Sequence, residues 1–287
     1  MSSSRKIRVV CISDTHGHAP GEGYVLPKGD VLIHAGDLTN QGSLNEIRRA
    51  AKWLGEADFA AKIVVAGNHD LSLDPEYTLK HDSGWRVVPT EAEECRQLMN
   101  DTNVVYLQHA HATVHVPGKD VALRVFGSPY SSDRGKQNWA FQYFDGEAEA
   151  TWKDIEANLD ILITHTPPAG ICDTSKHWQE GGCSALMKRL GQVRPSLHVN
   201  GHCHEGRGAA IIDWESNERT AWVDSSQGSK KLSRLDLTKL VPNSETAVVN
   251  ASIMATSHGR GGKSFNKAMV VDLLVTDRLE KNNEMTY

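Results

Sequence analysis

The chain has 287 residues, of which 39% are hydrophobic and 23% are charged, and its net charge is −5. These are the proportions of an ordinary globular protein, long enough to bury a core without disulfide bonds or a structural metal. The mild negative charge gives no reason to expect nucleic acid or an anionic membrane as a partner. No apolar stretch approaches the ~20 residues that a membrane helix needs.

The cysteines and the N-terminus bear on the compartment. The five cysteines are an odd number and contain no Cys-x-x-Cys pair, which argues against a disulfide framework and for a reducing environment. Residues 1–6 are followed by only a short apolar run, so we expect no cleavable signal. A cytoplasmic protein is therefore predicted, and a nuclear location is also compatible.

Five short apolar runs each lead directly into a loop that carries Asp, His or Asn. Their length and their β-branched content predict buried strands. The segments between them predict helices at residues 43–55, 90–100, 146–158 and 183–190. The first of these helices begins with a capping box formed by Ser43 and Glu46. The predicted strands span residues 7–12, 31–35, 62–66, 159–163 and 197–199.

Two further stretches predict hairpins, at residues 113–126 and 209–223, and residues 267–275 predict a last strand. Helices alternating with strands, together with hairpins, favour an α/β fold with two mixed β-sheets over a single doubly wound sheet. We expect one domain over residues 7–277, a disordered N-terminus at 1–6 and a C-terminal tail at 278–287.

The loops that follow the five strands contain enough ligand candidates for two metal ions. Sites in open α/β sheets form at the carboxyl ends of strands, so residues far apart in sequence can converge there. Two carboxylates, one amide and four imidazoles are too many for one ion, and a carboxylate could bridge two. Mixed nitrogen and oxygen ligands favour manganese or iron, with zinc possible. The candidates are Asp14, His16, Asp37, Asn68, His165, His202 and His204.

The two residues after Asn68 are candidates for acid–base chemistry. His69 could face the substrate while Asn68 faces the metal, because successive side chains alternate in direction. A carboxylate near an imidazole orients it and favours its protonated form. We therefore expect Asp70 to hold His69 as a general acid that protonates the leaving oxygen.

These blocks, D-x-H, G-D, G-N-H-[DE], a lone His and G-H-x-H, occur in the order typical of the calcineurin-like metallophosphoesterases, which the chain resembles. The resemblance extends to the metallophosphoesterase-domain-containing (MPPED) subgroup through further segments. One departure is Asp70, where that subgroup often has Glu, and residues 170–183 have a sequence of their own. The further segments are Ile12–His16, His34–Asp37, Gly127–Pro129, Thr164–Pro168, Gly201–Gly206 and Asn250–Ser252.

The resemblance implies a four-layer αββα sandwich and a role for each candidate. Asp14, His16 and His204 would hold one metal ion. Asn68, His165 and His202 would hold the other, and Asp37 would bridge the two. His69 and Asp70 would be the catalytic pair.

The expected function is hydrolysis of a phosphodiester, with a small substrate such as a cyclic nucleotide, by attack of a metal-activated hydroxide. The alternative enzyme is a phosphomonoesterase, either a protein Ser/Thr phosphatase or a nucleotidase, because the same metal core serves both. A metal-stabilised binding protein without catalysis is an alternative of another class, disfavoured because His69 and every ligand are present. A nuclease is weakened by the lack of a basic stripe. Four polar residues near the motifs could contact substrate or be solvated: Asp173, Lys176, His177 and Arg207.

Overall fold

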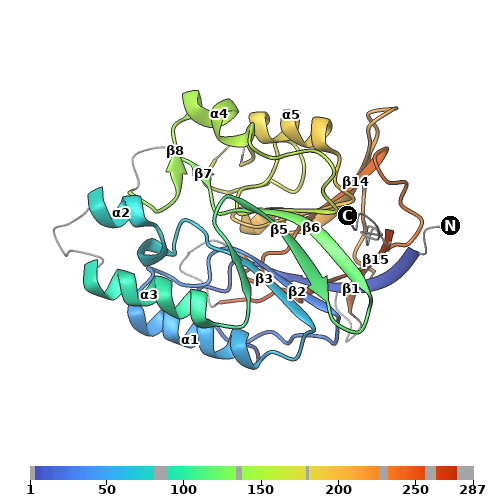
Figure 1. Ribbon diagram of the computed structural model, residues 1–287. Coiled ribbons are helices and arrows are strands. Elements are labelled where there is room, and N and C mark those ends of the chain that lie inside the picture. Colours follow the sequence, from blue (N-terminus) through green and yellow to red (C-terminus); the bar gives the residue numbers. More distant parts are fainter. Residues whose placement is uncertain are drawn as a thin grey trace, which may run out of the picture.

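The computed structural model describes residues 4–80, 89–133, 138–178, 181–225, 232–255 and 263–276. Two β-sheets lie face to face between two layers of helices (Figure 1). This is the predicted α/β sandwich with two mixed sheets.

The first sheet has six strands in the order β13-β15-β1-β2-β3-β4. Strands β1 to β4 are parallel, and β15 runs antiparallel to β1. Strands β2 and β3 are buried along their whole length, because helices cover one face and the second sheet the other. This explains why their sequences are apolar except at His34 and Lys62. The strands are β1 (Ser4–Ile12), β2 (Val31–Ala35), β3 (Ala61–Val65), β4 (Val105–Leu107), β13 (Ser233–Leu237) and β15 (Met269–Thr276).

The second sheet has seven strands in the order β12-β11-β14-β10-β9-β6-β5. Its centre is parallel, and the predicted hairpins β5/β6 and β11/β12 are antiparallel. A separate two-stranded sheet joins β7 (Ser131–Ser132) to β8 (Gln142–Tyr143). The seven strands are β5 (Ala110–Val116), β6 (Val121–Ser128), β9 (Ile161–Thr164), β10 (Leu197–Asn200), β11 (Gly208–Asp213), β12 (Arg219–Ala221) and β14 (Glu245–Asn250).

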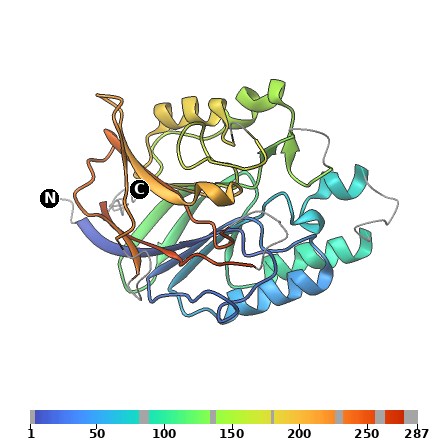
Figure 2. The same cartoon turned by 180° about the vertical axis from the view of Figure 1, so that it is seen from behind.

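Helices cover the outer face of each sheet. Helices α1 (Leu44–Glu56) and α3 (Pro89–Asp101) lie against the first sheet, and α4 (Ala148–Trp152) and α5 (Ser184–Val193) against the second, as the view from behind also shows (Figure 2). A short helix, α2 (Pro75–Lys80), lies beside α3.

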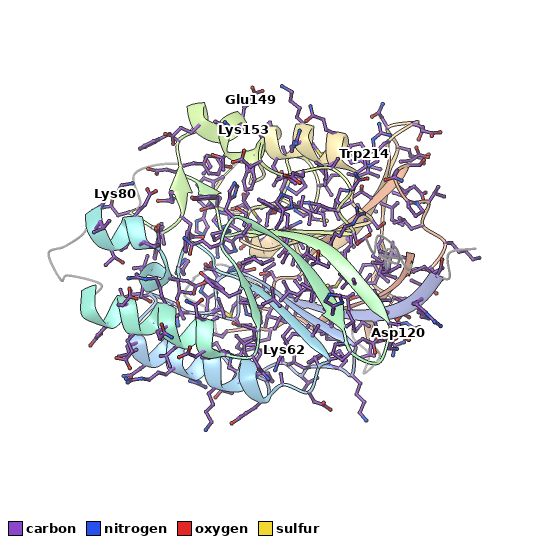
Figure 3. All side chains as sticks on the ribbon, viewed as in Figure 1. Lys62, Lys80, Asp120, Glu149, Lys153 and Trp214 are labelled. Carbon is purple, nitrogen blue, oxygen red and sulfur yellow. The ribbon has the colours of Figure 1, made fainter. Side chains whose placement is uncertain are left out.

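Side chains from both sheets fill the space between them (Figure 3). This central layer draws on residues from Ile7 to Val275, so the two sheets share one core. The second layer packs Ile47 and Leu54 of α1 against the first sheet, and the third packs Leu186 and Leu190 of α5 against the second. The four layers are therefore helices, sheet, sheet and helices, with an apolar cluster between each layer and the next. This is the αββα sandwich that the resemblance implied.

Several boundaries differ from the expectation. Strand β1 begins at Ser4, so the prediction that residues 4–6 belong to a disordered N-terminus is wrong; they pair with residues 274–276 of β15. The helix predicted at residues 146–158 is reduced to α4 after a 3₁₀ turn at Asp145–Glu147. Residues 1–3 and the predicted tail at 278–287 lie outside the described residues. All five cysteines are free, and no helix in the described part of the chain could cross a membrane.

Candidate metal centre

The predicted ligands come together where strands of both sheets end. Asp14, Asp37 and Asn68 follow the parallel strands β1, β2 and β3 of the first sheet. His165 and His202 follow the parallel strands β9 and β10 of the second. The face-to-face packing of the sheets thus brings the two sets of strand ends to one place.

Close packing at this place requires glycine. A Cβ atom on Gly36 would lie 2.4 Å from Nδ1 of His165, and one on Gly67 would lie 2.3 Å from Oδ1 of Asp37. Gly36 also has a φ of +99°, a conformation open to glycine without strain. The glycines of the G-D and G-N-H motifs therefore let the ligand loops approach one another.

The first cluster consists of Asp14, His16 and His204. Nε2 of His16 lies 3.2 Å from Nε2 of His204, and Nε2 of His204 lies 3.5 Å from Oδ1 of Asp14. All three side chains are buried, with at most 5% of any residue exposed. Two imidazole nitrogens and a carboxylate oxygen directed at one point form the ligand set for a cation of intermediate softness.

The second cluster consists of Asn68, His165 and His202. Nε2 of His165 lies 3.0 Å from Oδ1 of Asn68. The ring of His202 packs edge-on against that of His165, with centroids 4.9 Å apart. Nδ1 of His165 faces the carbonyl of Ala35 at 3.0 Å, and because a carbonyl only accepts, this contact leaves Nε2 for a metal.

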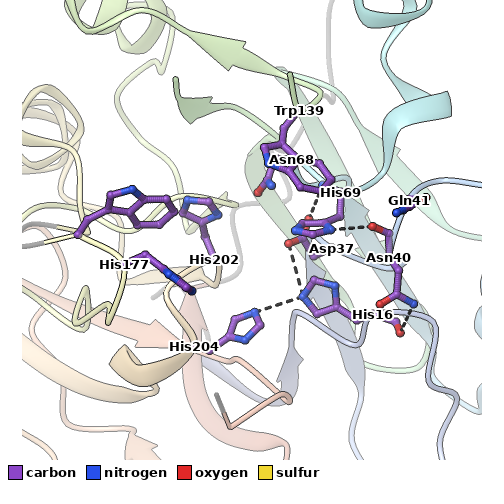
Figure 4. A pocket seen from close by; sticks show the side chains of 11 residues that line it. His16, Asp37, Asn40, Gln41, Asn68, His69, Trp139, His177, His202 and His204 are labelled. Carbon is purple, nitrogen blue, oxygen red and sulfur yellow. Dashed lines mark hydrogen bonds and ion pairs between the residues drawn. The ribbon is translucent and has the colours of Figure 1, made fainter. Parts of the chain in front are cut away.

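Asp37 lies between the clusters. Its Oδ2 is 3.7 Å from Nε2 of His16 (Figure 4). Its Oδ1 is 3.4 Å from Nε2 of His165. The backbone N–H of His69 donates to Oδ1 at 2.9 Å and fixes the carboxylate. Each oxygen thus faces a different cluster, which is the arrangement that a bridging carboxylate needs.

Four of the candidate ligands have a strained backbone conformation. Asp14, His16, Asp37 and His202 all have φ between +43° and +66°, a left-handed region that few non-glycine residues occupy. Hydrogen bonds hold these conformations: the N–H of His16 donates to the carbonyl of Asp37, and the N–H of His202 donates to the carboxylate of Asp14. Strain of this kind persists where surrounding contacts over-determine the backbone.

The electrostatics of the buried groups suit metal ligands. Burial lowers the pKa of His16 to about 3, so this imidazole stays neutral, as a ligand must. Burial alone would raise the pKa of Asp37, but the charge of His165 and the hydrogen bond with it hold this pKa well below its usual range. Burial would lower the pKa of His165, but the negative charge of the neighbouring Asp37 has the larger effect and raises this pKa to about 9. A bound cation would replace that proton.

His69 lies beside the first cluster. Its Nδ1 faces the carbonyl of Asn40 at 2.7 Å, so Nδ1 donates and Nε2 is left for other partners. Its ring packs against Trp139 with centroids 4.1 Å apart and planes tilted by 31°, and it meets His16 edge-on at 4.8 Å. A ring nitrogen of His69, a ring nitrogen of His16 and a carboxylate oxygen of Asp37 lie within 4.8 Å of one another, so these three groups could also hold a metal ion.

The predicted contact between Asp70 and the His69 ring is wrong. The His69 ring nitrogen Nδ1 faces the carbonyl of Asn40 instead, and the Asp70 carboxylate is fully buried. It accepts hydrogen bonds from Gly67 N, Leu38 N, Thr39 N and Thr39 Oγ1 at 2.7–3.2 Å. Asp70 therefore ties the loop after β3 to the loop after β2 and supports the candidate ligands that they carry.

A pocket of about 440 Å³ opens above the two clusters. Several residues that line it were not predicted from the sequence, because no metal-ligand motif contains them. They are Asn40, Gln41, Trp139 and Trp178. Trp178 stacks on His202 at 5.3 Å and 19°, and Trp139 lies against His69 at 4.1 Å and 31°. The link between Trp139 and the site is tertiary, since the N–H of Ala140 donates to the carbonyl of Asn68.

Of the four polar residues that could contact substrate, the structure places one in the pocket and pairs the other three elsewhere. His177 lines the pocket. Arg207 is directed away to Asp224 and Ser233, and Lys176 pairs with Glu205. Asp173 accepts from the N–H groups of its own loop.

Fold and site together define the class of the protein, an αββα sandwich with clustered metal-ligand candidates at its strand ends. The chain belongs to the calcineurin-like phosphoesterase family, whose sequence profile matches residues 7–206, and the predicted resemblance is confirmed. It is 39% identical over 212 residues to Metallophosphoesterase domain-containing protein 1 of Homo sapiens, covering 70% of this chain and 61% of that protein. This relative confirms the likeness to the MPPED subgroup.

Other relatives extend the comparison. UPF0046 protein K07C11.7 of Caenorhabditis elegans is 34% identical over 78% of this chain and 71% of its own length. Probable rhamnogalacturonate lyase C of Emericella nidulans is 38% identical over 74% of this chain, but only 18% of that protein is matched. The chain thus spans less than two thirds of the human and the Emericella relatives. A solved structure with 16% identity has a TM-score of 0.50, covers 87% of this chain and 91% of its own, and shares the fold.

Proposed function

We propose that the protein hydrolyses a phosphodiester with two divalent metal ions, and that its substrate is small, such as a cyclic nucleotide. The position of Asp37 supports two ions most directly, because its two oxygens face separate ligand clusters at 3.4 and 3.7 Å. The donor atoms are nitrogen and oxygen without sulfur, which favours manganese or iron and allows zinc.

Each cluster has the donors for one ion. Asp14, His16 and His204 would hold one, and Asn68, His165 and His202 the other. Two bound ions would polarise a phosphoryl group and would lower the pKa of a bound water enough to supply hydroxide at neutral pH. The residues of the chain then orient the ester and supply a proton to its leaving oxygen.

His69 is the residue proposed to supply that proton. Its Nδ1–H is committed to the carbonyl of Asn40, so the proton that the imidazolium form can give up is the one on Nε2, and the ring is left as the neutral Nδ1–H tautomer. Trp139 and Trp178 add flat apolar walls on two sides of the pocket. Such walls suit a substrate with a planar group, and base–aromatic stacking is worth ~1–3 kcal/mol per base.

The pocket volume supports a small substrate. About 440 Å³ lies in the range of small-molecule sites, ~300–1,000 Å³. The five free cysteines support a reducing compartment, such as the cytoplasm or the nucleus, as its place of action.

The test compares a monoester and a diester of the same chromophore with manganese-loaded protein. We expect faster hydrolysis of the diester, inhibition by chelators and two ions per chain by elemental analysis. Faster hydrolysis of the monoester would replace the proposal by a phosphomonoesterase. Tight binding of two ions without turnover of either ester would favour a binding protein.

A further inference from the structure

Glu46 makes more contacts than the capping of a helix requires. Its Oε2 accepts from the N–H and the hydroxyl of Ser43, at 3.1 and 2.8 Å, which completes the predicted capping box of α1. Its Oε1 faces the other way and accepts from Asn40, from the backbone N–H at 2.9 Å and from Nδ2 at 3.1 Å. One carboxylate thus joins the helix start to Asn40.

Asn40 is the residue whose carbonyl accepts the Nδ1–H of His69 at 2.7 Å. Its Nδ2 also donates to the carbonyl of His16 at 2.9 Å. Asn40, which is held by Glu46, therefore orients the ring of His69 and also contacts the backbone of His16, a proposed metal ligand. Figure 4 shows Asn40 directed toward both His69 and His16.

We propose that Glu46 is a positioning residue for catalysis, which fixes the tautomer and direction of His69 through Asn40. The inference rests on the proposed function, in which His69 is the general acid. A general acid must come within ~2.6–3.2 Å of the atom that it protonates, and a displacement of ~1 Å can cost ~10²-fold in rate. Because Glu46 holds Asn40 in place, it also holds the His69 ring in the position from which the ring delivers its proton.

The metal clusters have separate anchors. The N–H of His16 donates to the carbonyl of Asp37, and the N–H of His69 donates to Oδ1 of Asp37. These contacts do not pass through Glu46. Removal of its carboxylate should therefore disturb the ring of His69 more than the ligands, and it should change proton delivery while metal content stays the same.

The experiment compares Glu46→Ala with Ser43→Ala. Both substitutions remove part of the capping box of α1, but only the first removes the acceptor of Asn40. The two variants are assayed on an alkyl diester, whose leaving oxygen needs a proton, and on a nitrophenyl diester, whose leaving group needs little help. Metal content and urea unfolding are measured alongside.

We expect Glu46→Ala to lose about tenfold or more on the alkyl diester, part of the ~10²–10⁴-fold that a general acid supplies, and much less on the aryl diester. Ser43→Ala should change both rates alike and by little. Glu46→Gln keeps one acceptor oxygen and should recover part of the alkyl rate. Should Glu46→Ala fail to fold, Glu46→Gln and Asn40→Ala take its place, since Asn40→Ala keeps the carbonyl but loses the amide held by Glu46.

A second measurement does not depend on activity. The ring nitrogens of His69 are followed by NMR in metal-free, 15N-histidine-labelled protein, with the signal assigned by its absence in His69→Ala. The wild type and Ser43→Ala should show the Nδ1–H tautomer, and Glu46→Ala a mixture of tautomers. An unchanged tautomer in Glu46→Ala, or equal losses on the two esters, would overturn the role of Glu46. A wild type that hydrolyses no diester would refute the proposed function, while the tautomer measurement would still decide the link between Glu46 and His69.

Discussion

Replacement of Asp70 by Asn distinguishes a structural role of this residue from a catalytic one. The motif alone suggests that Asp70 orients His69, in which case the substitution would slow proton transfer and leave the fold intact. In the structure the carboxylate accepts four hydrogen bonds from the loops after β2 and β3. We therefore expect Asp70→Asn to lower stability and metal affinity together.

The size of the effect follows from the four donors. Oδ2 accepts from two backbone N–H groups, of Leu38 and Gly67, and Oδ1 accepts from the N–H and the hydroxyl of Thr39. Asn has one acceptor oxygen, which is best placed toward Leu38 and Gly67, because the Thr39 hydroxyl can turn and accept from the new NH₂ group. One buried N–H, that of Thr39, then loses its acceptor, at a cost of ~1–3 kcal/mol. Asp70→Ala leaves three buried N–H groups unpaired and should cost two to three times as much.

Urea unfolding of chelator-treated protein measures this cost. At a slope of ~3 kcal/mol/M, a loss of ~1–3 kcal/mol lowers the midpoint by ~0.3–1 M. Asp74→Asn is a matched control, because Asp74 is also buried and accepts from the N–H groups of Phe141 and Glu76. It should lose comparable stability but retain its metal. Wild-type stability and metal content in Asp70→Asn, with a selective loss on alkyl diesters, would refute this reasoning and restore the catalytic role.

Three further outcomes are expected. Asp37→Ala should abolish activity and lower the metal content below two ions, since both clusters lose an oxygen; near-normal turnover with two ions by elemental analysis would mean that the bridge is misassigned. His69→Ala should keep its metal and lose ~10²–10⁴-fold on an alkyl diester but less on an aryl diester, and the general-acid role fails if metal is lost or both esters slow equally. Burial would raise the pKa of Asp272, but hydrogen bonds from Arg8 and Arg234 lower it to about 2, from 3.8. The ionised carboxylate thus stabilises the fold above pH ~4, and this contribution is lost as the pH falls through ~2. Asp272→Asn should flatten the fall of the urea midpoint of chelator-treated protein over that range, and an unchanged pH dependence would contradict the assignment.

The sequence predicted which residues converge because two rules of local structure sufficed. Apolar runs predicted buried strands, and polar residues at their ends predicted a site at the carboxyl edge of a sheet. Asp14, Asp37 and His165 lie close together for this reason. The capping box of α1 and both hairpins were equally local, since turn and cap residues specify them directly.

The remaining features depend on tertiary contacts that no local pattern contains. Asp70 follows His69 in sequence, yet its partners Leu38 and Thr39 lie about thirty residues earlier. Trp139 reaches the pocket only because its loop is bonded to the carbonyl of Asn68. Residues 4–6 are polar and exposed, and they form strand because β15, far along the chain, offers a partner.

The two clusters of candidate ligands each draw on both sheets, which links the candidate metal centre to the core between them. Asp14 and His16 follow β1 of the first sheet, whereas His204 follows β10 of the second. Asn68 follows β3, and the other members of its cluster follow β9 and β10. The distance between the sheets, set by the packing of residues such as Val9 and Val199 in the shared layer, therefore sets the spacing of the ligands. Because packed interiors do not deform continuously, a well-packed core between the sheets is what keeps the Asp37 oxygens directed at two histidines from different sheets.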